Sequence, residues 1–330
     1  MKAMVIDRFG PPEVFELREL PDPEPGPGEV RIRVRASSLN PVDTKIRRGD
    51  VPVGPEFPAV LHGDVAGVVD ALGPGVEGFA EGDAVFGCAG GVRGLPGALA
   101  EYMIADARLI APAPESLSLE EAAALPLVSI TAWEALVDKV GVREGMHLLI
   151  HGGTGGVGHI GVQLAADAGA RVTVTVGNEH KASLARSLGA QEAVIHSQET
   201  VDRYVARLTA GQGFDAVFDT VGKQVLVDSI TAAGLYGQVV TISGRSTLDI
   251  KPAFQKQLTL HTVFMLIPML HNVRREHHGE ILREIAARVD GGRLRPLLDE
   301  RRFGFTEVAA AHARMEAGEH IGKIVLVNDF

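Results

Sequence analysis

The stretch His151-Gly-Gly-Thr-Gly-Gly-Val-Gly158 decides the fold of this chain. It follows the short apolar run Met146–Ile150 and opens a segment with helical spacing of apolar residues. Its glycines at positions 153, 155 and 158 fit the pattern G-x-G-x-x-G. In that pattern the first glycine permits a tight turn, the second lets the backbone approach a pyrophosphate, and the third lets the helix pack close to the strand. The stretch therefore predicts a dinucleotide phosphate at a helix N-terminus.

The residues after the loop complete the order that such a site needs. Ile160, Leu164 and Ala168 share one helical face, and Gly169 is placed to end the helix. Arg171–Val176 then reads as a buried, β-branched strand. Strand, turn, helix and strand form a βαβ unit, whereas the alternative is a plain turn in a chain with 39 glycines. The residues expected to bind the cofactor phosphates are Gly153, Thr154, Gly155, Gly156 and Val157.

Composition excludes several classes of protein. With 330 residues, of which 45% are hydrophobic and 22% charged, the chain is long enough for two domains and a sizeable core. A formal net charge of −10 argues against nucleic acid or an anionic membrane as a partner. The single cysteine, Cys88, forms no internal disulfide framework. Because neither an apolar span of membrane length nor a signal-like N-terminus stands out, we expect a cytoplasmic protein.

The pattern of the chain changes near Leu119. Before it, short β-like runs such as Val30–Ala36 alternate with glycine- and proline-rich turns, which predicts a small, irregular β domain. Ser118 is a candidate N-cap with Glu121 as its capping-box partner, and alternating strands and helices follow. Helices are expected over 180–188, 199–210, 223–233 and 276–289, and strands near 193–195, 216–219, 238–242 and 320–327. These βα repeats predict a parallel sheet covered by helices, and the last strand is expected to return to the first domain.

Ordered motifs along the whole chain carry a family resemblance. They are SLNPVD (38–43), GDVAGVV (63–69), GALAEY (97–102), AAALP (122–126), TA (131–132), the glycine loop, DTVG (219–222) and GKIVL (322–326). Together they resemble the medium-chain dehydrogenase/reductase superfamily, in its zinc-independent quinone oxidoreductase (zeta-crystallin-like) branch.

The resemblance implies an α/β fold in which a Rossmann-type parallel-sheet cofactor domain is inserted in a GroES-like, mainly β substrate domain. The implied boundaries are 1–121 for the substrate domain, 122–265 for the cofactor domain, and 266–330 for a helix and return strands that complete the first. It also implies an active site in the cleft between the domains and a homodimer or homotetramer.

The same resemblance makes a catalytic metal unexpected. Zinc-dependent relatives place a Cys, a Gly-His-Glu unit and a further Cys or Asp around the cleft, but here the matching positions hold Asn40 and Gly63-Asp64. His62 lies one residue early. Catalytic zinc needs about three protein ligands, and His62, Asp64 and Cys88 offer only an improvised set. The plainer interpretations are a turn histidine, a structural carboxylate near an arginine and a buried thiol.

The end of the second strand indicates which nicotinamide is used. NAD-specific proteins carry Asp or Glu there to accept a hydrogen bond from the ribose 2′-OH. Here the strand ends at Val176-Gly177-Asn178, and Glu179 comes late. By resemblance, Lys181 matches a phosphate-contacting lysine of the NADPH-dependent branch; the alternative is an exposed helix lysine. His196 stands where relatives often carry Tyr. We expect NADPH rather than NADH, with Asn178, Lys181 and His196 among its contacts.

Hydride addition to a quinone or an α,β-unsaturated carbonyl moves negative charge onto oxygen, which hydrogen-bond donors can stabilise without a metal. By resemblance, Asn40 is the first candidate donor, unless Asn40-Pro41 only forms a turn. Lys45 stands where several relatives carry Tyr and is either a proton donor or a solvated lysine beside Arg47 and Arg48. Thr131 matches a Thr near the nicotinamide; the alternative is a hydroxyl bonded to its own helix.

Ser243, at a strand end, is expected to contact the cofactor, and Phe264 to line the cleft, with a dimer contact or plain core as the alternative for residues 264–270. The sequence thus predicts an NADPH-dependent, zinc-independent reductase of quinones or activated alkenes, acting on a small molecule. Three alternatives stay open: a 2-enoyl thioester reductase, a metal-dependent alcohol dehydrogenase, and a non-catalytic NADPH-binding structural or regulatory protein.

Overall fold

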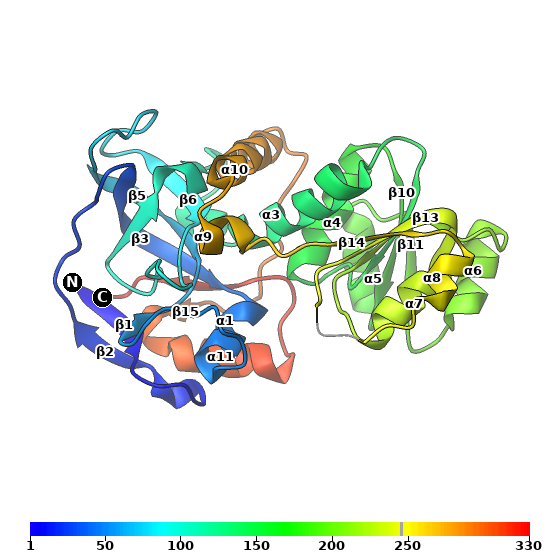
Figure 1. Ribbon diagram of the computed structural model, residues 1–330, viewed down its shortest axis with the longest axis horizontal. Helices are drawn as coiled ribbons and strands as arrows, with labels where there is room; N and C mark the ends of the chain where they lie inside the picture. Colours follow the sequence, from blue (N-terminus) through cyan, green and yellow to red (C-terminus); the bar gives the residue numbers. More distant parts are fainter. Residues whose placement is uncertain (245–246) are drawn as a thin grey trace. The chain divides into compact units, whose positions relative to one another are not determined.

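The computed structural model describes residues 1–244 and 247–330 and divides into two units (Figure 1). Unit 1 comprises residues 1–130 and 266–330, and unit 2 comprises residues 131–265. None of the helices in the described ranges is long and apolar enough to cross a membrane.

Unit 2 is built on a six-stranded parallel sheet with the strand order β11-β10-β9-β12-β13-β14. The strands are β9 (His147–His151), β10 (Arg171–Val176), β11 (Glu192–Ile195), β12 (Phe214–Asp219), β13 (Ala233–Thr241) and β14 (Thr259–Thr262). The first three strands build outward from β9 on one side, and the last three build outward from β12 on the other. Strand order therefore reverses between β9 and β12, which is the place where open α/β sheets bind ligands beyond the carboxyl ends of their strands.

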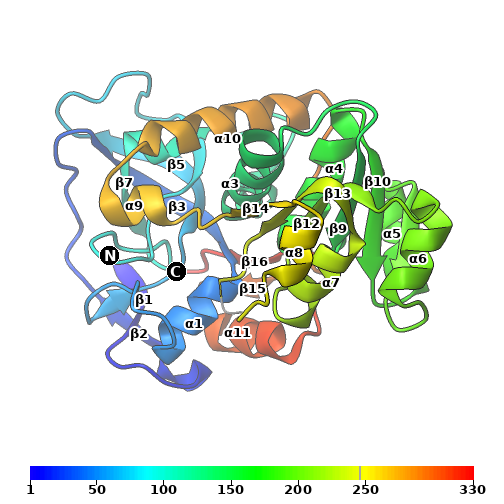
Figure 2. The same ribbon diagram turned by 45° about the vertical axis from the view of Figure 1, so that its right-hand side comes forward.

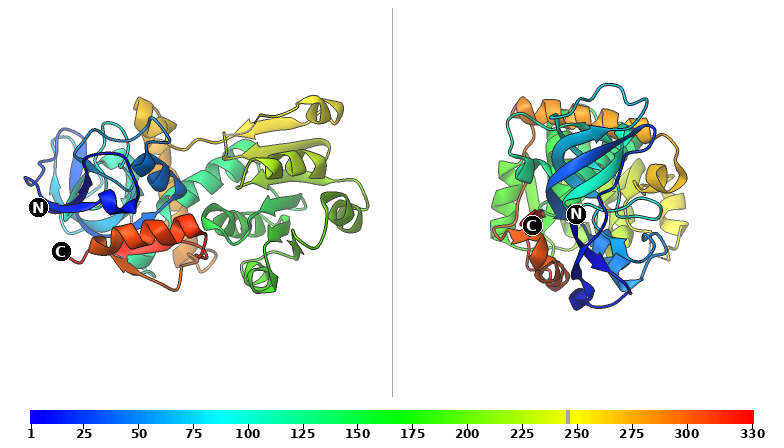
Figure 3. Two further views of the ribbon diagram at one scale, coloured as in Figure 1. Left: turned by 90° about the horizontal axis from the view of Figure 1, so that it is seen from below. Right: turned by 90° about the vertical axis from the view of Figure 1, so that its left-hand side faces the viewer.

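Helices cover both faces of this sheet (Figure 3). On one face, Leu149, Val217 and Val239 form a buried core with residues of α6, α7 and α8. On the other face α4 approaches closely, because a Cβ on Gly161 would lie 3.2 Å from the Phe218 ring. The helices of this unit are α4 (Gly156–Asp167), α5 (Glu179–Ser187), α6 (Val201–Thr209), α7 (Gln224–Ala232) and α8 (Lys251–Gln255), preceded by the π-helical segment Glu134–Val140. The predicted βα repeats are confirmed, and Gly169, with φ of 77°, follows α4 as expected.

Unit 1 is mainly β. Its seven-stranded sheet has the order β15-β16-β3-β5-β6-β8, with β7 paired to β3, and a second sheet has the order β2-β1-β4. The strands are β1 (Lys2–Ile6), β2 (Glu16–Glu19), β3 (Glu29–Leu39), β4 (Ala59–Val60), β5 (Asp64–Leu72), β6 (Ala84–Cys88), β7 (Tyr102–Asp106), β8 (Ile110–Pro112), β15 (Phe303–Gly304) and β16 (Ile324–Val327). The expected return strand is β16, although it begins at Ile324 rather than at residue 320.

Among the described residues, five helices and three single turns complete unit 1 (Figure 2). They are α1 (Pro41–Arg48), α2 (Leu119–Ala122), α9 (Ile267–His271), α10 (Arg275–Asp290) and α11 (Val308–Ala317), with single turns at Pro12–Val14, Ala107–Leu109 and Phe305–Glu307. Helix α3 (Pro126–Trp133) runs from unit 1 into unit 2. The capping box predicted for Ser118 and Glu121 starts α2. Helix α10 packs on β6 and β8, and α11 packs on β15 and β16.

Strand pairing in unit 1 brings three distant segments together. Strand β16 runs antiparallel to β3, with Ile324 opposite Leu39, and β3 also pairs with β5. The residues next to these pairs are Asn40 at the end of β3, Asp64 at the start of β5 and Lys323 just before β16. Backbone register alone therefore places an amide, a carboxylate and an ammonium side by side.

Candidate functional site

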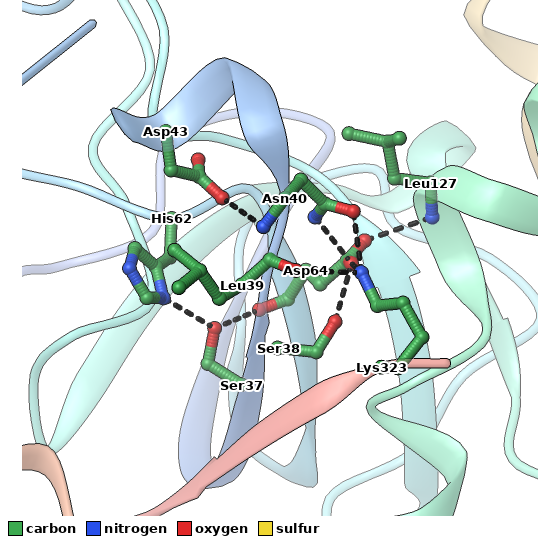
Figure 4. Close-up of polar contacts among 9 residues, drawn as sticks. All are labelled: Ser37, Ser38, Leu39, Asn40, Asp43, His62, Asp64, Leu127 and Lys323. Atoms are coloured by element: carbon green, nitrogen blue, oxygen red, sulfur yellow. Dashed lines mark hydrogen bonds and ion pairs between the residues drawn. The ribbon is translucent and has the colours of Figure 1, made fainter. Parts of the chain in front are cut away.

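A buried polar cluster lies where β3, β5 and β16 meet (Figure 4). Its centre is the Asp64 carboxylate, which has no exposed surface. Asp64 Oδ2 accepts hydrogen bonds from Ser38 Oγ and Asn40 Nδ2, both at 2.7 Å. Asp64 Oδ1 accepts at 2.8 Å from the backbone N–H of Leu127, in the first turn of α3. These donors compensate the loss of hydration that burial imposes on the carboxylate.

The positive charge in the cluster comes from Lys323. Its side chain is 2% exposed, and Nζ lies 3.4 Å from Asp64 Oδ2. The same ammonium donates to the carbonyl oxygen of Leu39 at 3.0 Å and to Asn40 Oδ1. Burial lowers the pKa of the Lys323 ammonium, whereas Asp64 and Asp43 raise it. Asp64 is thus a structural carboxylate as expected, but its cation is Lys323 rather than an arginine.

Asn40 is the predicted donor, and the structure places it inside this cluster. It caps the N-terminus of α1, with Pro41 as the first helical residue, and its side chain is 1% exposed. The amide carries two hydrogens on Nδ2, of which one is bound to Asp64, and its oxygen accepts from Lys323. Among the described residues, the second Nδ2 hydrogen has no protein acceptor. Asn40 therefore keeps one donor available to another molecule.

Asp43 binds the backbone of Asn40. Asp43 Oδ2 accepts from the backbone N–H of Asn40 at 2.8 Å, which closes the capping box of α1. Burial raises the pKa of the Asp43 carboxyl to about 7, and nearby Asp64 adds to the rise, while the Asn40 hydrogen bond and Lys323 oppose it. Asp43 is accordingly a carboxyl that gains or loses its proton close to neutral pH.

His62 faces away from the Asp64 carboxylate. It has φ of 70° in the irregular segment between β4 and β5, and its ring lies between Ser37 and His312. The Nε2 atoms of His62 and His312 are 3.0 Å apart, and His62 Nδ1 lies 3.4 Å from Ser37 Oγ. Burial lowers the pKa of His62 to about 3. A neutral ring in this position packs and bonds within the core of unit 1.

The residues that match zinc-ligand positions do not assemble into a metal-binding set. In ranges 1–244 and 247–330, no three His, Cys, Asp or Glu side chains are grouped so as to hold a metal ion. Cys88, paired with Asp64 across β5 and β6, is fully buried, and burial raises the pKa of its thiol well above the usual value. A neutral thiol is a poor metal ligand.

In unit 2, the three motif glycines differ in what a side chain at their position would meet. A Cβ on Gly153 would lie 2.6 Å from Val174 of β10, and a Cβ on Gly158 would overlap the carbonyl of Gly152. Gly153 therefore lets the loop pack against β10, and Gly158 lets the start of α4 pack against the loop. Gly155 differs: its φ and ψ of −76° and 175° suit any residue, and a Cβ there would meet only Gly152 O at 3.3 Å. Apart from its chain neighbours, no other described atom of the protein lies within 4 Å of the position that a Cβ on Gly155 would take, so the space beside this residue is open.

The open space adjoins the N-terminus of α4, a 12-residue helix that begins at Gly156, followed by Val157. Backbone N–H groups at such an end favour a phosphate. Thr154, 5% exposed, lies in the same loop. Beyond the neighbouring strand, Asp219 Oδ1 accepts from the N–H groups of Val221 and Gly222, and Ser243, half-buried, lies against Gly222. Glycine loop, DTVG turn and Ser243 thus line the carboxyl end of the sheet.

Three of the predicted cofactor residues lie in the segments that follow β10 and β11. Asn178 caps α5, where its Oδ1 accepts from the N–H of Lys181 at 2.9 Å. His196 is exposed at the end of β11, and its Nε2 lies 3.8 Å from the position that a Cβ on Gly177 would take. Lys181 is half-buried. One carboxylate, Glu179, is next to the strand end, at the first position of α5.

Three predicted residues remain: Lys45, Thr131 and Phe264. Lys45 is half-buried on α1. Its neighbour Arg47 is not solvated but fully buried, with Nη2 at 2.5 Å from Glu316 on α11, so the basic cluster ties α1 to α11. Thr131 is buried in α3, and Phe264 is 50% exposed after β14. Sequence reasoning missed the role of Lys323, whose only signal was the GKIVL motif.

Two family models match the chain. Residues 26–115 match the alcohol dehydrogenase GroES-like domain, and residues 188–326 match the zinc-binding dehydrogenases. Over 335 residues the chain is 32% identical to 2-methylene-furan-3-one reductase of Solanum lycopersicum, an alignment that covers 99% of this chain and 79% of the relative. It is 28% identical over 331 residues to quinone oxidoreductase of Homo sapiens, covering 99% and 98%. The chain belongs to the medium-chain dehydrogenase/reductase superfamily, in its quinone oxidoreductase-like branch.

Solved structures of this superfamily are similar over the whole chain. An alcohol dehydrogenase superfamily protein from Novosphingobium aromaticivorans is 42% identical, with a TM-score of 0.95 and full coverage of both chains. An NAD-dependent alcohol dehydrogenase is 35% identical, with a TM-score of 0.89 and 99% coverage of each chain. A mycobacterial protein complexed with NADPH is 28% identical, with a TM-score of 0.87 and 99% coverage of each. The GroES-like and Rossmann-type fold is therefore confirmed, and the chain is an oxidoreductase.

Proposed function

We propose that this oxidoreductase uses NADPH, without zinc, to reduce a quinone or an α,β-unsaturated carbonyl compound. The observation that carries the proposal is the ammonium of Lys323, which is bound to Asp64 Oδ2 and Asn40 Oδ1. Both residues match positions used for zinc binding in metal-dependent relatives. A buried cation already neutralises the oxygen atoms there, so a second cation would meet electrostatic repulsion.

The chain's own residues fit a dinucleotide. The open space at Gly155 and the first N–H groups of α4 would hold the pyrophosphate, with Gly153, Thr154, Gly156 and Val157 forming the loop around it. Ser243 and Phe264 are the proposed contacts toward the nicotinamide. When bound, the cofactor supplies a hydride. The protein's part is to orient the two reactants and to place hydrogen-bond donors where negative charge develops.

The preference for NADPH rests on the end of β10. Lys181 and His196 offer a cation and a titratable ring near Gly177, and α5 begins there with a helix N-terminus that favours an added phosphate. Glu179 is a carboxylate next to this strand end, and its negative charge would repel the 2′-phosphate of NADPH. The solved relatives include one described as NAD-dependent and one complexed with NADPH, so the family admits both cofactors.

The proposed substrate class is inferred from the names of the relatives and from the second Nδ2 hydrogen of Asn40, which no protein acceptor in the described residues binds. Hydride arriving at a β-carbon or a quinone ring sends charge to oxygen, and the second Nδ2 hydrogen of Asn40 is suited to stabilise it. Lys45 and Thr131 are proposed as further polar residues of the reaction, with Lys45 the candidate proton donor. The 2-methylene-furan-3-one reductase and the quinone oxidoreductases among the relatives support a small conjugated carbonyl compound as the acceptor.

We also propose that the protein forms a homodimer or homotetramer. Unit 2 exposes Leu235, Tyr236 and Phe254 at 71%, 73% and 82%, and the outer strand β14 has no partner on its far side within the described sheet. Exposed apolar groups and an open strand edge each favour contact with another chain. Light scattering after size exclusion is expected to give a homodimer or homotetramer.

The test is an assay of NADPH and NADH oxidation with quinones, enones and enoyl thioesters, using protein dialysed against EDTA and checked for bound metal. We expect turnover of quinones or enones, with a higher kcat/KM for NADPH than for NADH. If only enoyl thioesters are turned over, the protein is a 2-enoyl thioester reductase. If turnover needs added zinc, it is a metal-dependent dehydrogenase. If NADPH binds but no compound is turned over, the protein is a non-catalytic NADPH-binding protein.

A further inference from the structure

We propose that Lys323 is a positioning residue that, together with Asp64, fixes which way the Asn40 amide points. This inference rests on the proposed function, because it explains how Asn40 presents a single N–H group. The contacts that carry it are Lys323 Nζ to Asn40 Oδ1 and Asn40 Nδ2 to Asp64 Oδ2 (Figure 4).

The two charged groups leave the amide one orientation. An ammonium has three donors and no acceptor, and an ionised carboxylate only accepts. The amide therefore has to turn its oxygen to Lys323 and its nitrogen to Asp64. Turning it by half a rotation would set the NH2 group against the ammonium and the oxygen against the carboxylate. In a site shielded from water both contacts would be strongly unfavourable.

Lys323 acts through Asn40 and is not itself a donor to substrate. Each of its three N–H groups has an acceptor: the Leu39 carbonyl, Asn40 Oδ1 and Asp64 Oδ2. The Asn40 amide, by contrast, has a hydrogen left on Nδ2. The ion pair thus converts an ambiguous amide into a donor of fixed direction, at the cost of burying two charges.

The remaining contacts hold the pair in place. Asp64 is fixed by Ser38 and by the N–H of Leu127, and Lys323 by the pairing of β16 with β3. Asn40 is held from behind by Asp43, which bonds its backbone N–H and not its amide. Only Lys323 and Asp64 therefore decide the amide's direction, and the inference can be tested by removing the ammonium alone.

Lys323→Met removes the charge and keeps most of the side-chain volume. We expect kcat for the enone or quinone to fall about tenfold or more, since the loss of one preorganised donor costs roughly 100- to 1000-fold when it is complete. The dissociation constant of NADPH should stay within about twofold of wild type, because the cofactor residues belong to unit 2. Lys323→Arg, which keeps the charge, should recover part of kcat.

Lys256→Met is the matched control. Lys256 Nζ also donates to three acceptors, the carbonyl oxygens of Ile230, Thr231 and Ala233, but it lies in unit 2 and caps α7. Its loss should lower the melting temperature and leave kcat unchanged. An equal fall in kcat for both variants would mean that any lost lysine anchor slows turnover, which would overturn the positioning role.

A double-mutant comparison separates action through Asn40 from independent action. In an Asn40→Ala background, adding Lys323→Met should lower kcat by no more than about twofold, because the group that Lys323 orients is already gone. If the two losses multiply, Lys323 acts by itself and the inference is wrong. If Lys323→Met fails to fold, the neutral pair Asp64→Asn with Lys323→Met takes its place, with the same expectations.

One readout does not depend on activity. A neutron or high-resolution crystal structure of the neutral pair, in which neither charged group remains, should show the Asn40 amide turned or in two orientations, whereas wild type shows one. An unchanged single orientation would overturn the inference even if the enzyme is active. Wild-type protein that turns over no acceptor would instead overturn the proposed function, and the amide orientation would still decide the role of Lys323.

Discussion

Gly155→Ala tests whether the glycine loop binds a dinucleotide. At Gly155 the protein itself tolerates a side chain: φ is −76°, and the added Cβ would meet only Gly152 O, at 3.3 Å. The free energy of unfolding should therefore change by no more than about 1 kcal/mol, the usual range for a glycine replaced at compatible dihedral angles. The methyl group would occupy the space through which a phosphate reaches the N-terminus of α4. We expect the dissociation constant of NADPH to rise at least about tenfold, or about 1.4 kcal/mol.

Gly158→Ala is the contrasting variant, because its Cβ would overlap the carbonyl of Gly152. It should lose about 1–3 kcal/mol of stability, as overpacked sites do. Both variants are measured by denaturant unfolding and by titration of NADPH fluorescence. If Gly155→Ala folds like wild type and binds NADPH with unchanged affinity, the loop does not hold the pyrophosphate. If it loses as much stability as Gly158→Ala, glycine at 155 serves folding and not ligand approach.

Three further expectations concern cofactor choice and pH. Lys181→Ala should raise KM for NADPH much more than KM for NADH in steady-state assays; equal changes would remove Lys181 from the phosphate site. Because the pKa of Asp43 is raised to about 7 in the fold from an ordinary value near 3.8, its proton stabilises the native state, and stability is lost as pH rises from about 4 to 7. Between pH 5 and pH 8 the stability of Asp43→Asn relative to wild type should therefore rise by about 2.6 kcal/mol in urea unfolding, and a flat difference would refute the raised pKa. Because the pKa of His62 is lowered to about 3, His62 stays neutral in the fold and its contribution is lost as pH falls below about 6.5. Asn tolerates the positive φ at position 62. Between pH 7.5 and pH 5.5, the free energy of unfolding of His62→Asn should fall by about 1.4 kcal/mol less than that of wild type, and parallel pH curves for the two proteins would contradict this.

The βαβ order was predictable because its signals are local. Helices α5, α6 and α7 begin and end within two residues of the predicted ranges, because helical spacing of apolar residues marks each segment and a glycine follows it closely. The strands of unit 1 were less visible. Strands β7 and β8 are short, and their pairing with β3 and β6 links segments far apart in sequence, which no local pattern encodes.

The site was predictable in part for the same reason. Asn40 could be singled out from the SLNPVD motif, and the loop glycines from their spacing. Lys323 could not, because it contacts Asn40 from 283 residues further along the chain, and only the register of β16 on β3 brings the two together. The cation beside Asp64 is Lys323 instead of the expected arginine, and Arg47 pairs with Glu316.

Hydride transfer to a conjugated acceptor without a metal is the central claim, and an isotope experiment tests it most directly. Metal-stripped protein is given NADPH labelled with deuterium at the transferable position together with an enone, and the product is analysed by NMR. The account predicts one deuterium at the β-carbon of the saturated ketone, at a rate that EDTA does not change. Deuterium at the carbonyl carbon, or label transfer that appears only after zinc is added, would contradict it.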